Sequence, residues 1–180
     1  MKATGIVRRI DDLGRVVIPK EIRRTLRIKE GDPLEIFTDR EGEVILKKYS
    51  PIGELGTFAK EYAEALAQSS GHQALITDRD HVIAVSGGAK KEWVGRNITS
   101  QLEDLIQARE QVLKNQGDGG FVKITGEENE GAEAVCPIIA EGDAIGAVIL
   151  LGKEPRGRMG ETEKVLVKCA AGFLGRQMEQ

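Results

Sequence analysis

Basic side chains are concentrated in a short stretch near the start of the chain. In a helix beginning at Lys20, the residues Lys20, Arg23, Arg24 and Arg27 would follow the spacing i, i+3, i+4 and i+7, which places them on one face. Guanidinium groups pair with phosphate oxygens and, through two parallel hydrogen bonds, with the edge of guanine. The spacing therefore predicts a surface for an anionic partner, although charge runs of this kind also occur on solvated faces that bind nothing.

The distribution of charge along the chain supports a partner for one end only. The 180 residues carry a net charge of −3, yet residues 1–30 hold 9 Lys and Arg against 4 Asp and Glu, whereas residues 51–180 hold 14 against 20. Such asymmetry indicates an anionic partner at the basic end. The N-terminus lacks an apolar segment typical of a signal peptide, and the longest apolar run, Ala144–Leu151, is too short to span a bilayer. We expect a cytoplasmic protein with no membrane partner.

The residues that could support catalysis or metal binding are few. Cys136 and Cys169 lie far apart and match no metal or redox spacing. Their neighbours are apolar, and no basic residue beside Cys136 would activate its thiol. We predict two reduced, partly buried thiols, no catalytic residue, no metal and no cofactor, with a redox enzyme as an alternative that the cysteines leave open.

The first fifty residues are predicted to form a small mixed β/α domain. Its turns lie at Asp11–Gly14, Gly31-Asp32 and Asp39–Gly42. A segment of this size buries too little surface to fold well alone, and it has no disulfide or metal to stabilise it. Oligomerisation by exchange of strands between two chains is the remaining solution. The predicted elements are strands at Gly5–Ile10, Arg15–Ile18, Leu34–Phe37 and Val44–Lys47 and a helix at Lys20–Leu26.

The stretch from Thr4 to Pro19, TGIVRRIDDLGRVVIP, closely resembles the AbrB-type transition-state regulators of spore-forming bacteria, and the resemblance covers essentially all of residues 1–50. It implies an intertwined swapped-hairpin dimer, a small dimeric barrel, that binds double-stranded DNA. Helix-turn-helix spacing and zinc-finger ligands are both missing, so a recognition helix of the usual kind is not implied. The arginines that match the DNA-contacting surface of the family are Arg8, Arg15, Arg23 and Arg24.

The predicted DNA-binding set includes two further basic residues of this region, Arg9 and Lys20, and Arg27 is a secondary candidate. On the opposite side of the same helix, Ile18, Ile22 and Leu26 recur every four residues. We expect these three side chains to help build a dimer core that one chain cannot form.

Proline and glycine follow the last strand of the first domain, so we expect a linker at residues 51–55. A second domain is expected to occupy residues 56–180. Its pattern is that of an α+β domain, an antiparallel sheet with helices on its faces. The expected helices are Leu55–Gln68, Lys91–Val94, Gln101–Asn115 and Glu161–Met178, and the expected strands are Gln73–Thr77, His81–Val85, Phe121–Ile124, Ala134–Ile139 and Ala144–Leu151.

The last hairpin, with Cys136–Ile139 followed by Ile145–Ile149, is similar to the end of a GAF domain, a small-molecule sensor and dimerisation module. The sequence lacks the Asn-Lys and Phe-Asp-Glu signature of cyclic-nucleotide GAF domains, so any ligand is unidentified. Ser86–Ala89 could present backbone amides to an anion, or it is a flexible turn.

An AbrB-type head on a GAF-like body implies a transcription factor of the developing spore that acts both as activator and as repressor. The resemblance also implies association with the nucleoid of the forespore. It further implies a tetramer, in which the swapped heads pair the chains and the helices that flank the GAF-like domains form a bundle. Two alternatives remain. One is an antitoxin-like protein, although the tail of such proteins is usually short and disordered; the other is a GAF-type redox enzyme.

Overall fold

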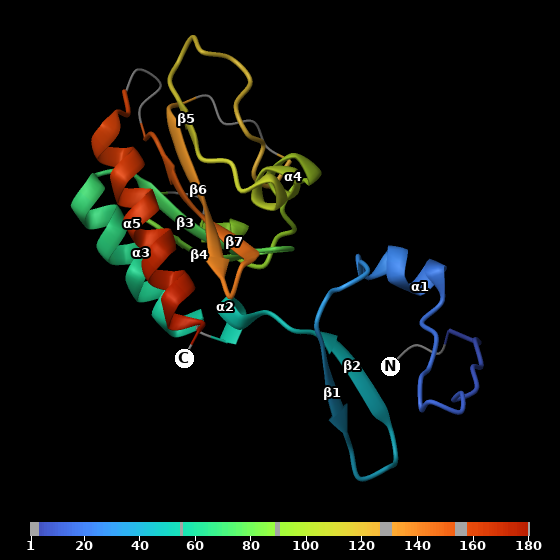
Figure 1. Ribbon diagram of the computed structural model, residues 1–180. Coiled ribbons are helices and arrows are strands. Elements are labelled where there is room, and N and C mark those ends of the chain that lie inside the picture. Colours follow the sequence, from blue (N-terminus) through green and yellow to red (C-terminus); the bar gives the residue numbers. More distant parts are fainter. Residues whose placement is uncertain (1–3, 55, 89–90, 127–130, 154–157, 180) are drawn as a thin grey trace. The chain divides into compact units, whose positions relative to one another are not determined.

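The chain forms two compact units, Met1–Tyr49 and Ser50–Gln180 (Figure 1). The computed structural model describes residues 4–54, 56–88, 91–126, 131–153 and 158–179. Within these ranges, no helix combines the length and the apolar character that a membrane span requires.

The first unit contains one short helix and one regular hairpin. Helix α1 spans Lys20–Thr25, strand β1 spans Leu34–Thr38 and strand β2 spans Val44–Lys48. The two strands are antiparallel, with Ile36 opposite Leu46. These strands were expected from the sequence, and the structure confirms them.

The arms of the N-terminal hairpin differ from expectation. Gly5–Ile10 and Arg15–Ile18, both predicted as strands, form no strand in the structure. The turn between them is present: the Gly14 N–H donates to the Asp11 carbonyl at 3.0 Å, and Gly14 has a φ of +77°. An isolated two-stranded hairpin is at best marginally stable, so arms of this kind need further strands beside them.

Within residues 4–49, the first unit has no hydrophobic core of its own. Every Val, Ile, Leu and Phe among residues 4–49 is at least partly exposed; Val7 is 85% exposed and Ile36 66%. Ile18 and Ile22 are half-buried and Leu26 is exposed. Because apolar burial is the main favourable term in folding, this unit needs a partner surface.

Helix α1 is shorter than the basic pattern predicted. It ends at Thr25, and Arg27 adopts the left-handed conformation with a φ of 52°. The Ile28 N–H donates to the Arg23 carbonyl at 2.7 Å and the Arg27 N–H to the Arg24 carbonyl at 3.3 Å, which is a Schellman C-cap. Arg27 therefore lies outside the helix, and the basic face of α1 is limited to Lys20, Arg23 and Arg24.

The second unit begins with a helix where a linker was expected. Helix α2 spans Pro51–Glu54, and the Ser50 Oγ accepts a hydrogen bond from the Gly53 N–H at 3.0 Å. Proline suits the first position of a helix, and a serine before it caps the free N–H groups. Ile52 is buried in the core of this unit, so the segment is part of the folded body.

A five-stranded antiparallel sheet forms the centre of the second unit. The strands are β3 (Gln73–Asp78), β4 (Val82–Ser86), β5 (Val112–Lys114), β6 (Glu133–Ala140) and β7 (Asp143–Leu151), in the order β4-β3-β7-β6-β5. Glu141 and Gly142 form the turn between β6 and β7, both with positive φ, as a tight hairpin with a two-residue loop requires.

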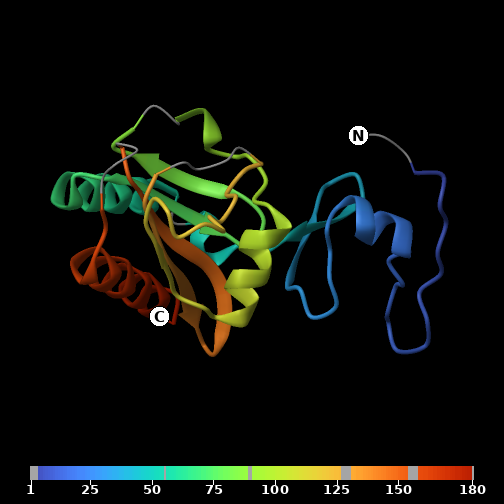
Figure 2. The same ribbon diagram turned by 90° about the horizontal axis from the view of Figure 1, so that it is seen from above.

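Helices cover both faces of this sheet (Figure 2). Helices α3 (Gly56–Ser70) and α5 (Glu161–Gln177) lie side by side on one face, and α4 (Ser100–Ala108) with the short 3₁₀ helix η1 (Lys91–Trp93) covers the other. Side chains alternate along β3 accordingly: Ile76 packs in the α3/α5 core and Leu75 in the α4 core. The α+β architecture predicted from the sequence is confirmed.

Two elements of the second unit were predicted wrongly. The helix expected over Gln101–Asn115 ends at Ala108, because Arg109 takes the left-handed conformation with a φ of 57° and its N–H donates to the Ile106 carbonyl. Residues 112–114 then form β5 beside β6. Phe121–Ile124 is not a strand; there the Val122 N–H donates to the buried Glu133 carboxylate at 2.8 Å.

Candidate nucleic-acid interface

The predicted DNA-binding residues lie on three segments of the first unit. Arg8 and Arg9 are exposed on the first arm of the N-terminal hairpin, and Arg15 is exposed directly after its turn. The other three are on α1, where Lys20 and Arg24 are exposed and Arg23 is half-buried. Helix α1 therefore brings Lys20, Arg23 and Arg24 together.

Two of these arginines are held by acceptors within the chain. The Arg15 Nε donates to the Asp11 Oδ2 at 2.9 Å, with exposed fractions of 69% and 37% for the two side chains. The Arg23 Nε donates to the Ile18 carbonyl at 3.2 Å. In each case the bond uses Nε, so the two terminal amino groups of the guanidinium can still form a fork on phosphate or guanine.

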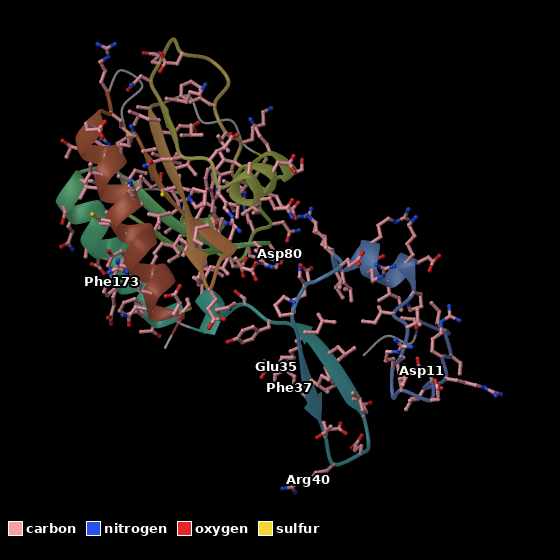
Figure 3. The ribbon with its side chains drawn as sticks, viewed as in Figure 1. Asp11, Glu35, Phe37, Arg40, Asp80 and Phe173 are labelled. Carbon is pink, nitrogen blue, oxygen red and sulfur yellow. The ribbon has the colours of Figure 1, made fainter. Side chains whose placement is uncertain are left out.

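Asp11 is a residue of this region that reasoning from the sequence missed. Its pKa is held below the ordinary value, first by the hydrogen bond from the Arg15 backbone N–H and then by the Arg15 guanidinium, and these effects outweigh the small desolvation of the carboxyl. The signal in the sequence is Asp11 four residues before Arg15, across a glycine turn. Figure 3 labels Asp11 in the N-terminal hairpin.

Some basic residues of the first unit support its own structure. The Lys48 Nζ donates to the Arg27 carbonyl at 2.8 Å and lies 3.5 Å from the Asp32 carboxylate. The Lys47 Nζ lies 4.7 Å from the centre of the Phe37 ring. These lysines connect β1, β2 and the segment after α1, so their positive charge also has a structural use.

The second unit carries an apolar patch on the outer side of α3 and α5. The rings of Tyr62 and Phe173 are stacked at 5.4 Å, and Phe58 lies 6.1 Å and 6.0 Å from them. Phe173 is 42% exposed and Val165 is also exposed. We call Phe58, Tyr62, Val165, Cys169 and Phe173 the aromatic face. Phe58 and Tyr62 are half-buried, so the exposed apolar surface comes from Phe173 and Val165, and an exposed apolar patch is typical of an interface.

The two cysteines differ in their surroundings. Both are free thiols; Cys136 is buried and Cys169 is exposed on α5, so the prediction of partial burial was wrong for Cys169. Burial raises the pKa of the Cys136 thiol, and the charge of Lys168 offsets this only in part. Burial also raises the pKa of the Tyr62 hydroxyl, with a further contribution from Cys169.

Other candidate ligand positions give little support for a site. Among the described residues, no group of three or more His, Cys, Asp and Glu side chains is placed to hold a metal ion. At the predicted glycine turn, a Cβ added to Gly87 would lie 2.7 Å from the Ala67 Cβ, and one added to Gly88 would lie 2.6 Å from the Gln73 side chain. Ala89 lies outside the described residues. The two glycines are therefore needed for close packing.

The fold of the second unit has known counterparts. A GAF domain from an Acinetobacter phosphoenolpyruvate-protein phosphotransferase matches with a TM-score of 0.58 at 14% sequence identity, over 73% of this chain and 84% of that chain. At this identity the likeness concerns the fold alone. The second unit is thus a GAF-like domain.

The first unit is similar to regulatory proteins in sequence. It is 67% identical over 51 residues to the transition state regulatory protein AbrB of Bacillus subtilis (strain 168), covering 28% of this chain and 52% of that protein. Residues 7–54 also match a family described as antidote-toxin recognition MazE, bacterial antitoxin. The chain is therefore an AbrB-type head followed by a GAF-like body.

The comparison over the full length is more specific. Residues 54–179 match the family described as stage V sporulation protein T C-terminal, transcription factor. The chain is 60% identical over 182 residues to stage V sporulation protein T of Bacillus subtilis (strain 168), covering 100% of both. It belongs to the stage V sporulation protein T family of transcription factors, and its function is regulatory, not enzymatic.

Proposed function

We propose that this transcription factor binds double-stranded DNA through Arg8, Arg9, Arg15, Lys20, Arg23 and Arg24 of its first unit. The observation that carries the proposal is that the unit, 67% identical to part of AbrB, presents these basic side chains on exposed or half-exposed positions. The AbrB N-terminal domain is described as a DNA recognition domain. Phosphate contacts from such a set would supply most of the affinity.

The binding unit is an intertwined dimer of two first units. Its support is that every Val, Ile, Leu and Phe in residues 4–49 is at least partly exposed, and that the hairpin arms, which a second chain would complete, form no strand. Ile18, Ile22 and Leu26 contribute to the shared core. A two-fold dimer doubles the arginine set and presents it to two successive sites on the duplex.

The body makes the second contact between chains and forms a tetramer. Its support is the aromatic face, where Phe173 and Val165 leave apolar surface exposed on a helix pair. A copy of the same helices is the occupant that fits, because it would meet this face with the same apolar surface. A small-molecule ligand of the GAF-like fold remains unidentified.

The biological role that follows is control of spore-development genes, as activator and as repressor, in the cytoplasm at the nucleoid of the forespore. The support is full-length similarity to a protein named for a stage of sporulation. Activation and repression by one factor need only different positions of its DNA sites relative to the promoter.

The test is DNA affinity measured by fluorescence anisotropy at several salt concentrations. Arg15→Ala and Arg24→Ala should each weaken binding at least about tenfold, and the logarithm of the binding constant should fall with the logarithm of salt concentration by about 0.9 per phosphate neutralised. Arg40→Ala is the matched control, because Arg40 carries the same charge at the tip of the β1–β2 hairpin (Figure 3). Size-exclusion chromatography must show unchanged oligomers.

Wild-type affinity in Arg15→Ala and Arg24→Ala would refute this assignment of the binding face. An antitoxin role is the second candidate, since residues 7–54 match an antitoxin family. The folded body of residues 50–180 favours the regulator. Limited proteolysis that leaves a compact C-terminal fragment would support the regulator, whereas degradation of the whole body would support a disordered, toxin-wrapping tail.

A further inference from the structure

Asp11 and Arg15 are joined by three hydrogen bonds across the N-terminal turn. The Arg15 N–H donates to the Asp11 Oδ1 at 2.7 Å, and the Arg15 Nε donates to the Asp11 Oδ2 at 2.9 Å. In the third bond the Asp11 N–H donates to the Arg15 carbonyl at 3.0 Å. One carboxylate thus closes the turn with one oxygen and directs the arginine with the other.

The bond pattern leaves Arg15 prepared for a ligand. The bond to Asp11 uses Nε, and the Arg15 side chain is 69% exposed. Its two terminal amino groups therefore form a fork that can pair with two acceptors. Fixing the side chain before binding also reduces the rotamer entropy lost in the complex. Arg23 is held through its Nε in the same way, by the Ile18 carbonyl.

A carboxylate on a DNA-binding surface also has an electrostatic effect. Its charge repels phosphates and partly neutralises the neighbouring guanidinium, so it weakens attraction to any duplex regardless of sequence. The carboxyl is ionised at neutral pH, and the hydrogen bonds from Arg15 hold its pKa below the ordinary value. Asp11 should therefore lower non-specific affinity while it improves the geometry of a specific contact.

We propose that Asp11 is a positioning residue that sets DNA specificity by holding Arg15 for a directed contact. The proposal rests on the proposed DNA-binding function of Arg15. It predicts that the ratio of specific to non-specific affinity, more than affinity itself, depends on Asp11.

Asp11→Asn is the informative substitution. Asparagine keeps an oxygen that can accept from the Leu13 and Arg15 N–H groups, which now donate to the Asp11 Oδ1 at 3.0 Å and 2.7 Å. Its amide NH₂ cannot accept from the Arg15 Nε. Asp12→Asn is the matched control: it removes the same charge from the adjacent exposed residue, for which the described part of the chain contains no side-chain hydrogen bond or ion pair.

The experiment uses the full-length protein and two duplexes of equal length and composition. One is selected from a random pool by the wild-type protein, and the other is a scrambled version of it. Asp11→Asn should lower the affinity ratio of selected to scrambled duplex about tenfold, because the selected duplex loses the directed Arg15 contact, whereas the lost negative charge raises both affinities alike. Asp12→Asn should raise both affinities together and leave the ratio unchanged.

A double variant shows whether Asp11 acts through Arg15. In an Arg15→Lys background, which lacks Nε of a guanidinium, Asp11→Asn should change the ratio no more than Asp12→Asn does. If Asp11→Asn and Asp12→Asn give the same ratio in the wild-type background, the proposal is wrong even when Arg15→Ala weakens binding. If Arg15→Ala leaves binding unchanged, the proposed DNA-binding face fails and this inference fails with it.

Discussion

The Ser50 hydroxyl donates a hydrogen bond to the Asp78 Oδ2 at 2.7 Å, connecting the first residue of the second unit to the end of β3. The other oxygen of Asp78 accepts from the Asp80 and His81 N–H groups at 2.7 Å and 2.6 Å. Asp78 is 6% exposed, so these donors replace the water that a carboxylate loses on burial. The point at which the chain enters the body is thus held at the β3–β4 turn.

Loss of this connection should destabilise the body. Ser50→Ala removes both the hydrogen bond to Asp78 and the cap on the Gly53 N–H, and we expect a loss of about 1–2 kcal/mol in the free energy of unfolding. Urea denaturation followed by the fluorescence of Trp93 measures it, because Trp93 is the single tryptophan of the sequence and is fully buried in the body.

Ser69→Ala is the control for this prediction. Ser69 is an exposed residue of α3, and alanine has a higher helix propensity than serine, so stability should be unchanged or slightly increased. Equal stability of Ser50→Ala and Ser69→Ala would show that the Ser50–Asp78 bond contributes nothing measurable to the body.

The sequence predicted the elements whose pattern is local and regular. Two continuous apolar runs around a tight turn at Glu141–Asp143 predicted the β6–β7 hairpin, and helical spacing predicted α3 and α5. The course of the chain after α4 could not be predicted in this way, because Arg109 ends the helix in a left-handed conformation that favours glycine. The composition beyond it reads as helix, whereas pairing with β6 makes residues 112–114 a strand.

The candidate DNA-binding site could likewise be predicted from the sequence only in part. The resemblance of residues 1–50 to a family singled out Arg8, Arg15, Arg23 and Arg24 as candidates, which charge alone could not separate from a solvated face. The spacing rule also included Arg27, although the Schellman cap removes it from the helix. Asp11 was missed because its importance depends on a turn that brings both its oxygens to Arg15.

Two glycines of α5 should respond in opposite directions to alanine. A Cβ added to Gly175 would overlap the Ile139 carbonyl oxygen, since α5 lies directly against β6 there. Gly175→Ala should therefore destabilise the body by about 1–3 kcal/mol. A Cβ on Gly172 meets nothing within 4 Å, so Gly172→Ala should stabilise it by about 0.5–1 kcal/mol. Thermal unfolding compares the two, and destabilisation by both variants would contradict the exposed position of Gly172.

The start of α5 should make the body sensitive to acid. Burial opposes ionisation of the Glu163 carboxyl. This effect is outweighed by hydrogen bonds from the backbone N–H groups of Gly160 and Glu163 and by the interaction with His72, so the pKa of Glu163 lies below the ordinary 4.5. The Gly160 N–H donates to the carboxylate at 2.7 Å. A carboxyl with a lower pKa in the folded state stabilises above its unfolded pKa, and this stability disappears as the pH falls through the folded value.

Glu163→Gln should consequently lower the free energy of unfolding at pH 7 by about 0.5–1 kcal/mol, and the difference from wild type should shrink as the pH falls below the ordinary pKa of 4.5 and through the lower folded value. Urea titrations of Trp93 fluorescence at several pH values measure this. Glu161→Gln is the control, because Glu161 lies in the same first turn with a 77% exposed side chain and should have a smaller effect. A difference between wild type and Glu163→Gln that stays constant down to pH 3 would contradict the role given to the carboxylate.

The reactivity of the two thiols should report whether the aromatic face is covered by a second copy of the chain. Only the thiolate reacts readily with a disulfide reagent, so burial and the raised pKa both protect Cys136 in the folded body. Cys169 is exposed in the single chain but would be covered if the α3 and α5 helices of two chains pair. Both thiols of the wild type should therefore react slowly at pH 8.

In Phe173→Asp, which places a charge in the aromatic face, the oligomer should become smaller by light scattering, and one thiol per chain should react rapidly. Adding Cys169→Ser to that variant should abolish the rapid phase. Rapid reaction of Cys169 in the wild-type oligomer would show that the chains associate through another surface.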